Sequence, residues 1–127
     1  MYYQNNLIGF LNILEMIKKY NVKSIIFSSS ATVYGNPDSI PAKETAKRSF
    51  TNPYGGTKLM SEQILEGLNV SDKNLSIIIL RYFNPVGAHE TGLIGENPKG
   101  IPNNLMPVVL KVATGEMEKV KIFGNDY

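Results

Sequence analysis

Three consecutive isoleucines, Ile77 to Ile79, lie at the centre of a largely apolar run from Leu75 to Phe83. β-Branched side chains in such a run favour the pleated, buried setting of a sheet interior. A second run, from Val22 to Phe27, is typical of a buried strand, and it leads directly into three serines, Ser28 to Ser30. We therefore expect two buried strands.

Helical segments alternate with these strands. Apolar residues recur near a 3.6-residue period from Tyr3 to Tyr20, which predicts a packed helix. Asn52 and Pro53 supply an N-cap and a first helical residue for a second helix, from Tyr54 to about Gly67. This alternation predicts an α/β sheet. The remaining segments are predicted as a surface connection from Gly35 to Pro53, a loop from Gly87 to Pro102, a helix around Leu105 to Thr114 and a strand near Val120 to Phe123.

Composition excludes several classes of function. The 127 residues are 43% hydrophobic and 19% charged, as in part of a soluble globular protein, and the net charge of +2 is dispersed, so no nucleic-acid partner is indicated. No apolar stretch approaches a membrane span, and we expect a cytoplasmic protein without a membrane partner. The chain has no cysteine, and its one histidine, His89, lacks companions at ligand spacing, so we expect no metal site.

Tyr54 and Lys58 are four positions apart in the sequence, so on a helix their side chains project from one face. A nearby ammonium lowers the pKa of a phenol, which would let Tyr54 exchange protons with a sugar hydroxyl near neutral pH. Gly55 and Gly56 lie between them and cost helix stability, which close approach of a bound molecule would explain. Taken alone, a Tyr-x-x-x-Lys pair is more often an exposed surface pair.

The serine cluster, Ser28 to Ser30, lies at the carboxyl end of a predicted strand, where open α/β sheets bind ligands. The hydroxyl of Ser30 or Thr32 could hold a reacting hydroxyl against Tyr54, because a hydroxyl both donates and accepts hydrogen bonds. The alternative is that these serines only cap the end of the strand.

Together these motifs carry a family resemblance. The segment Ser28 to Gly35, followed by Tyr54 to Lys58, resembles the catalytic signature of the extended short-chain dehydrogenase/reductase superfamily. Within it, Arg81 to His89, Gly100 to Pro107 and Ile122 to Tyr127 resemble the UDP-glucose 4-epimerase family, and the likeness covers nearly the whole chain. It implies a Rossmann-type doubly wound parallel sheet, with the NAD-binding domain in residues 1–84 and the beginning of a UDP-sugar-binding region in residues 85–127.

The resemblance also implies roles for individual residues. Tyr54 would be the acid/base, Lys58 would bind the nicotinamide ribose, and Ser30 would orient the sugar hydroxyl. Hydride would pass from sugar C4 to NAD, the 4-keto intermediate would turn, and hydride would return to its other face. Further contacts are implied to NAD from Asn5, Ser30, Tyr54, Lys58 and Phe83, and to UDP-glucose or UDP-galactose from Ser30, Thr32, Tyr54, Asn84, Asn104, Leu105, Lys121, Ile122 and Phe123.

Several of these residues have plainer interpretations. Asn5 could cap a helix, Phe83 and Phe123 could be core residues, and Asn84 could begin a turn before Pro85. No glycine-rich turn for the NAD pyrophosphate occurs. We therefore expect a chain truncated at both ends, inactive alone, from a homodimeric enzyme of galactose metabolism. The alternatives are another nucleotide-sugar epimerase, a 4,6-dehydratase, and a non-catalytic nucleotide-sugar-binding module; Ala31 and Thr32 stand where the dehydratase needs an acidic pair.

Overall fold

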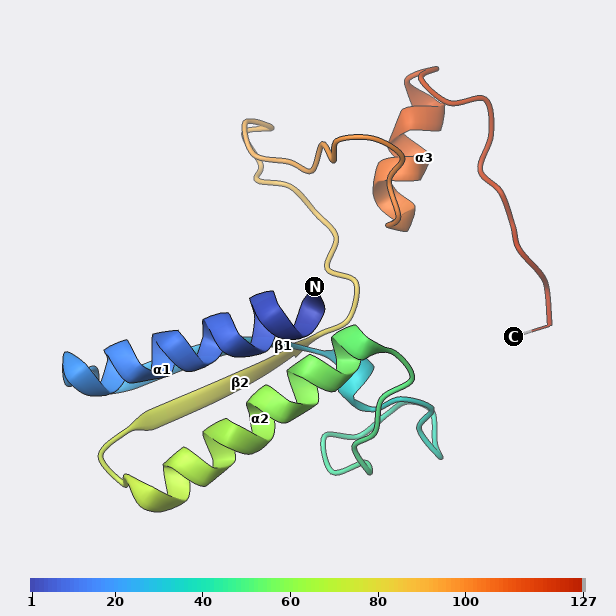
Figure 1. Ribbon diagram of the computed structural model, residues 1–127. Coiled ribbons are helices and arrows are strands. Elements are labelled where there is room, and N and C mark those ends of the chain that lie inside the picture. The colour runs from blue at the N-terminus through green and yellow to red at the C-terminus, as the bar shows by residue number, and fades with distance from the viewer. Residues whose placement is uncertain (127) are drawn as a thin grey trace. The chain divides into compact units, whose positions relative to one another are not determined.

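A computed structural model describes residues 1–126, which divide into two compact units, Met1–Phe83 and a second that begins at Asn84. The first unit contains two parallel strands and two long helices, and the second contains one helix, which confirms the predicted alternation. The elements are the π-helical turn η1 (Tyr3–Ile8), α1 (Gly9–Lys19), β1 (Ser24–Ser30), the 3-10 turn η2 (Ala31–Val33), α2 (Pro53–Ser71), β2 (Ser76–Tyr82) and α3 (Leu105–Ala113) (Figure 1).

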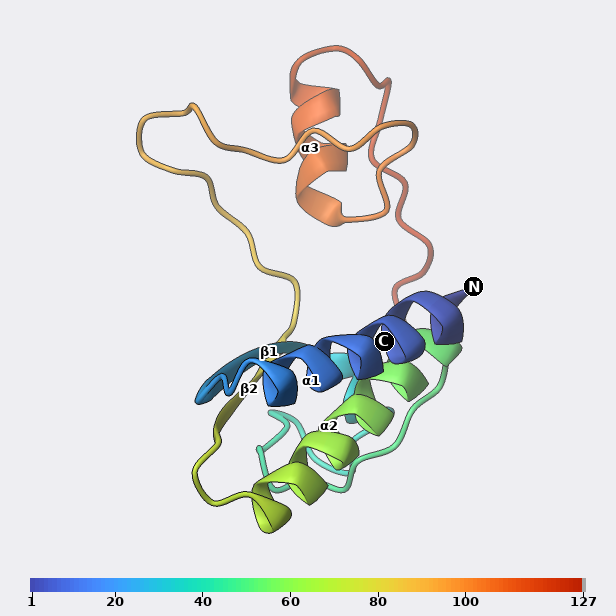
Figure 2. The ribbon, with the colours of Figure 1, turned by 60° about the vertical axis from the view of Figure 1, so that its left-hand side comes forward.

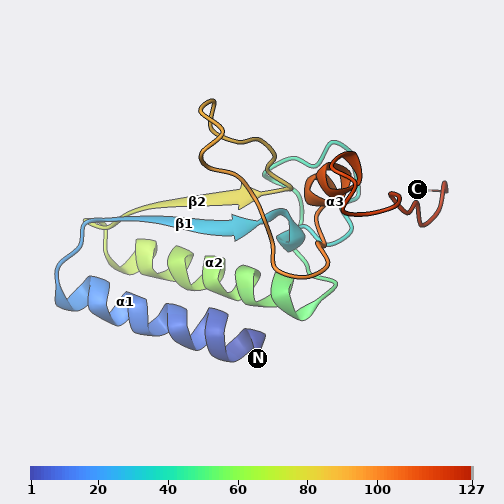
Figure 3. The same cartoon turned by 90° about the horizontal axis from the view of Figure 1, so that it is seen from above.

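Both long helices of the first unit cover the same face of the sheet (Figure 3). β1 and β2 pair in parallel, from Ser24 opposite Ser76 to Ser30 opposite Tyr82. Between the strands and the helices lies an apolar core, because alternate strand residues point toward α1 and α2. Its fully enclosed members are Phe10, Ile25, Leu65 and Leu75.

The opposite face of the sheet is not covered by any other element of the first unit. Ile26 is 67% exposed and Ile78 is 50% exposed, whereas their neighbours on the other face, Ile25 and Ile77, pack in the core. The expectation of fully buried strands was therefore wrong for this face. Its apolar side chains are typical of a parallel sheet that has helices on both sides.

The start of α2 follows the sequence signals. The side chain of Asn52 accepts a hydrogen bond from the backbone N–H of Gly55 at 2.8 Å, and Pro53 is the first helical residue, which confirms both predictions. The helix continues past Gly67 to Ser71. An isolated glycine weakens a helix but does not end it where the following residues are still packed against the core, as Leu68 is.

The second unit is built around α3, with irregular segments on either side of it (Figure 2). The helix agrees with the predicted range around Leu105 to Thr114. The predicted strand near Val120 to Phe123 was wrong, because these four residues have no regular structure. A strand requires a neighbour for its backbone hydrogen bonds, and none pairs with this segment within residues 1–126.

Candidate active site

The carboxyl end of β1, the turn η2 and the first turn of α2 pack directly against one another. Lys58 Nζ donates a hydrogen bond to the backbone carbonyl of Ser28 at 2.9 Å. A Cβ placed on Gly55 would lie 3.0 Å from the Thr32 carbonyl oxygen, so the helix backbone touches η2. Two segments that lie far apart in the sequence, Ser28 to Thr32 and Tyr54 to Lys58, thus form one surface.

Tyr54 and Lys58 are neighbours on one face of α2, as their spacing predicts. The Lys58 ammonium lies 5.7 Å from the centroid of the Tyr54 ring and 5.0 Å from that of Phe27. Burial lowers the pKa of Lys58, because a partly desolvated ammonium is costly. Both side chains are therefore half-buried and Lys58 binds the serine cluster, unlike the exposed surface pair that the motif alone would indicate.

Ser30 and Thr32 form a hydroxyl pair next to this surface. Ser30 Oγ accepts from the backbone N–H of Thr32 at 3.2 Å, and the Thr32 hydroxyl lies 3.0 Å from it. Ser30 therefore caps η2, in accord with the plainer interpretation of the serine cluster. Because the pair has two hydroxyl protons and uses one between its members, the other remains for an acceptor outside the residues described.

The two glycines of α2 are explained by contacts within the chain. A Cβ on Gly55 would meet the Thr32 carbonyl, and a Cβ on Gly56 would lie 3.2 Å from the ring of Phe50. The close approach that we attributed to a bound molecule is therefore made by η2 and by the connection before α2. The glycines set how near the first turn of α2 comes to η2 and to Phe50.

Alanine at Gly55 is expected to destabilise the protein relative to alanine at Gly67, which lies in the same helix with nothing within 4 Å of its Cβ position. Each change gains up to about 1 kcal/mol of helix propensity. Only Gly55→Ala adds the strain of overpacking against a backbone carbonyl, about 1–3 kcal/mol. Thermal unfolding of the two variants checks this, and an equal rise in Tm for both would contradict it.

Near the N-terminus, Asn5 and Tyr2 line a cavity of about 340 Å³ together with Met1 and Asn6. The ring of Tyr2 packs edge to face on Tyr54, with centroids 5.9 Å apart. Asn6 Nδ2 donates to the hydroxyl of Thr57 at 3.2 Å. Asn5 lies within η1 and caps no helix, and its exposed amide is placed at the same end of α2 as Tyr54.

The remaining candidates are exposed residues. Phe83, just after β2, is 70% exposed and Phe123 is 85% exposed, so neither is a core residue of this chain. Asn104 is the N-cap position of α3 and its amide donates to Glu96 at 3.2 Å. Six candidates belong to the second unit, namely Asn84, Asn104, Leu105, Lys121, Ile122 and Phe123.

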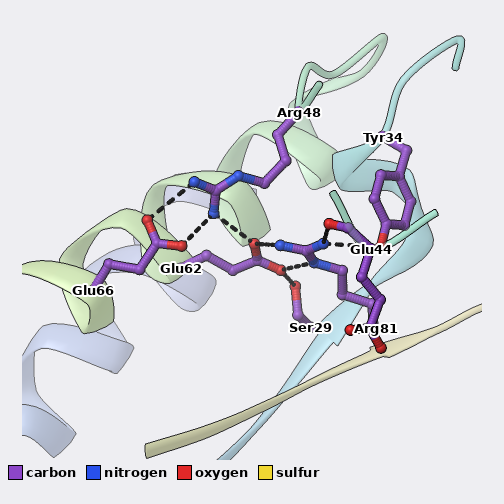
Figure 4. A network of polar contacts seen from close by, with 7 residues as sticks. All are labelled: Ser29, Tyr34, Glu44, Arg48, Glu62, Glu66 and Arg81. Atoms are coloured by element: carbon purple, nitrogen blue, oxygen red, sulfur yellow. Dashed lines mark hydrogen bonds and ion pairs between the residues drawn. The ribbon is translucent and has the colours of Figure 1, made fainter. Parts of the chain in front are cut away.

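A buried ionic network lies beside the candidate site, and the sequence analysis missed it (Figure 4). The carboxylate of Glu62, on α2, is fully buried. It accepts hydrogen bonds from Ser29 Oγ at 2.6 Å, from two nitrogens of Arg81 at 2.9 and 3.0 Å, and from Arg48 at 3.1 Å. Arg48 also forms a two-bond ion pair with Glu66, at 2.6 and 3.0 Å.

In this network, the ionised forms of Glu62 and Arg81 stabilise each other. Burial raises the pKa of Glu62, but hydrogen bonds from Arg81, Ser29 and Arg48 outweigh it, and the pKa is lowered. The hydrogen bond to Glu62 in turn raises the pKa of Arg81. Arg81 also donates to the phenol oxygen of Tyr34 at 2.8 Å and to the Glu44 carbonyl at 3.1 Å. Glu62 is therefore an ionised carboxylate at neutral pH.

Residues 1–126 contain no cluster of three or more potential metal ligands, and Nδ1 of His89 lies 2.9 Å from the hydroxyl oxygen of Thr91. No helix in the same range is long and apolar enough to cross a bilayer.

Known proteins resemble this chain along nearly its whole length. The profile of the NAD dependent epimerase/dehydratase family matches residues 1–126. The UDP-glucose 4-epimerase of Bacillus subtilis is 57% identical over 126 residues, which are 99% of this chain and 37% of that enzyme. The chain therefore spans little more than a third of the length of this relative.

Solved structures agree in fold. The crystal structure of UDP-glucose 4-epimerase from Bifidobacterium longum, in complex with NAD+ and UDP, matches with a TM-score of 0.91 at 57% identity, covering 98% of this chain and 38% of that one. The enzyme from Stenotrophomonas maltophila, with bound NAD and formylated UDP-arabinopyranose, matches with a TM-score of 0.94 at 48% identity, covering 98% and 37%.

Proposed function

Because this chain belongs to the NAD dependent epimerase/dehydratase family, we propose that it supplies the proton-transfer group of an enzyme that interconverts UDP-glucose and UDP-galactose. The observation that carries the proposal is that Lys58, beside Tyr54 on α2, donates a hydrogen bond to the carboxyl end of β1, where Ser30 lies. A tyrosine, a lysine and a serine in this arrangement are suited to remove and return the proton of a sugar hydroxyl.

The donor set of the site fits NAD. Lys58 uses one of its three N–H donors on the Ser28 carbonyl, and within the described residues the other two remain for the two hydroxyls of a ribose. The exposed amide of Asn5 borders a cavity at the same end of α2, and Phe83 exposes an aromatic ring just beyond β2. Bound NAD would supply reversible hydride acceptance at sugar C4.

Each residue of the group has a distinct task. Tyr54 takes up and returns the proton of the C4 hydroxyl, and the ammonium of Lys58 lies beside it, 5.7 Å from the centroid of its ring. Ser30, paired with Thr32, orients that hydroxyl with the proton that the pair retains. Contacts to the UDP-sugar are proposed for Asn84, Asn104, Leu105, Lys121, Ile122 and Phe123.

Epimerisation is favoured over 4,6-dehydration by the residues that follow Ser30. Dehydration needs an additional acid and base, and Ala31 and Thr32 cannot supply a carboxylate. A non-catalytic binding module would not require a half-buried lysine beside a tyrosine, whose partial desolvation costs free energy. Another nucleotide-sugar epimerase remains the second candidate, because the chain alone does not define the pocket for the sugar.

The full-length protein is expected to convert UDP-galactose into UDP-glucose with no net consumption of added NAD. Chromatography of the products formed from UDP-galactose and from its N-acetylated analogue would check this. Conversion of only the N-acetylated sugar would move the assignment to the second candidate, and a product that lacks the C6 oxygen would indicate the dehydratase.

We further propose that the 127 residues alone do not turn over substrate. The uncovered face with Ile26 and Ile78, and the lack of a glycine-rich turn for the NAD pyrophosphate, support this. Epimerisation by purified residues 1–127 with added NAD, at the rate of the full-length protein, would contradict it. For the full-length protein we propose a homodimer that acts in the cytoplasm in galactose metabolism.

A further inference from the structure

We propose that Glu62 is a positioning residue for the reaction, because its buried carboxylate holds α2 and both strands in the register that places Tyr54 and Lys58 beside Ser30. The proposal rests on the function proposed above. Within residues 1–126, Glu62 makes no hydrogen bond to Ser30, Tyr54 or Lys58, and it acts through Ser29 and Arg81, which it binds (Figure 4).

The carboxylate joins three elements of the first unit, β1, β2 and α2. Ser29, which donates at 2.6 Å, is the residue before Ser30 on β1. Arg81, which donates at 2.9 and 3.0 Å, lies on β2, two residues before Phe83. Glu62 itself lies on α2. A single side chain therefore fixes the positions of these elements relative to one another.

The same face of α2 carries Tyr54, Lys58 and Glu62 at intervals of four residues. Lys58 binds the carbonyl of Ser28, and Glu62 binds the hydroxyl of Ser29, so successive turns of the helix hold successive residues of the strand. A shift of α2 along β1 would break both hydrogen bonds. Together they define where the phenol of Tyr54 lies along the strand.

The apolar contacts of α2 cannot supply the same precision. Leu65, one turn further along, is fully buried in the core among Phe10, Ile25 and Leu75. Such contacts depend on area and tolerate small displacements, whereas hydrogen bonds weaken steeply with misalignment. Because a misplacement of about 1 Å can cost about a hundredfold in rate, directional contacts next to the site matter for turnover.

The network also fixes the connection between η2 and α2. Arg81 donates to the Tyr34 hydroxyl at 2.8 Å and to the Glu44 carbonyl at 3.1 Å, and Arg48 binds Glu62 at 3.1 Å. Tyr34 follows η2, which contains Thr32. Glu62 is therefore linked through Arg81 to Tyr34 and directly to Arg48, near the two ends of the connection between η2 and α2.

The test compares Ser29→Ala and Glu62→Gln with Leu65→Ala in the full-length protein. Ser29→Ala removes one hydrogen bond, and Glu62→Gln replaces an acceptor oxygen with a donor that faces guanidinium groups. Leu65→Ala is the matched control, because it destabilises the same helix away from the network. The measurements are kcat per bound NAD, KM for UDP-galactose and the pH profile of kcat, all well below the unfolding temperature.

We expect kcat per bound NAD to fall about tenfold in Ser29→Ala and about a hundredfold in Glu62→Gln, with KM changed less than about twofold. We also expect the apparent pKa of the kcat profile to shift in both variants, because Tyr54 and Lys58 no longer hold the same position. Leu65→Ala should lose stability yet keep kcat and the profile. If the Glu62→Gln protein does not fold, the kcat and the pH profile of Ser29→Ala alone test the positioning role.

Unchanged kcat and pH profile in Ser29→Ala, or equal losses in Leu65→Ala, would overturn the positioning role. The proposed function would then still stand if Tyr54→Phe abolishes turnover of an active wild-type protein. A wild-type protein that epimerises no UDP-sugar would overturn the proposed function and this role together.

Discussion

Replacing Tyr54 with phenylalanine is expected to lower kcat of the full-length protein by about 10²–10⁴-fold, the usual contribution of a positioned proton-transfer group. The change removes one oxygen and keeps the ring, so the edge-to-face contact with Tyr2 remains. The backbone carbonyl of Tyr54, which accepts from the Thr57 hydroxyl at 2.7 Å, is also unaffected. The fold and bound NAD should therefore be retained while turnover is lost.

Tyr20→Phe provides the control for this experiment. Tyr20 is an exposed tyrosine at the end of α1 and loses the same oxygen away from the site. Its kcat should match the wild type. The decisive measurements are initial rates with UDP-galactose, NAD content after purification and thermal unfolding. A Tyr54→Phe protein that turns over at the wild-type rate would remove Tyr54 from the mechanism.

Replacing Arg81 with methionine is expected to cause the largest loss of stability. The change leaves the fully buried carboxylate of Glu62 without two of its hydrogen bonds and also removes the donor to Tyr34. Breaking a buried ion pair by removing one partner costs about 3–5 kcal/mol, and here the remaining carboxylate keeps only Ser29 and Arg48 as hydrogen-bond donors. For a domain of about 150–250 residues, this loss of free energy corresponds to a fall in Tm of about 10 °C.

The pH dependence of this loss has a definite sign. The pKa of Glu62 is lowered in the folded state, so its contribution to the free energy of unfolding is present at neutral pH and is lost as pH falls through that lowered pKa. Removing Arg81 raises the pKa of Glu62, and protonation of Glu62 at low pH then removes the charge that has lost this partner. The difference in Tm between wild type and Arg81→Met should therefore narrow as pH falls from about 7 to about 3.

Lys119→Ala is the matched control for Arg81→Met, because Lys119 and Glu118 form an exposed ion pair at 3.5 Å. Lys119→Ala should lower the free energy of unfolding by less than about 1 kcal/mol at any of these pH values. Thermal unfolding of the three proteins across the pH series makes the comparison. An Arg81→Met protein with wild-type Tm at pH 7 would show that other contacts compensate for the lost pair.

The sequence was sufficient to predict the elements that depend on local signals. The helix that begins at Asn52 and Pro53, and the run of isoleucines in β2, follow from capping chemistry and β-branching, which act over a few residues. The family was predicted because several long motifs occur in the right order. The strand near Val120 was wrong, since apolar alternation indicates a strand but does not provide a partner for it.

The ionic network could not have been predicted in the same way. Ser29 and Glu62 are 33 positions apart, and Tyr34 and Arg81 are 47 apart, so only the fold brings them together. One signal was available: Glu62 lies four residues after Lys58 on the same helix face. A charged residue on the face that packs against a strand requires a partner, and Arg81 at the end of β2 was the nearest candidate in the fold.

The pairing of β1 with β2 has a consequence for synthesis of the protein. Every backbone contact between the two strands joins residues about 50 positions apart, because α2 and the connection before it lie between them. At about 5–20 residues per second, β1 leaves the ribosome several seconds before its partner. During that interval the edge of β1 that later pairs with β2 is open to other chains. A nascent chain of this protein is therefore exposed to aggregation through this edge until β2 has been synthesised.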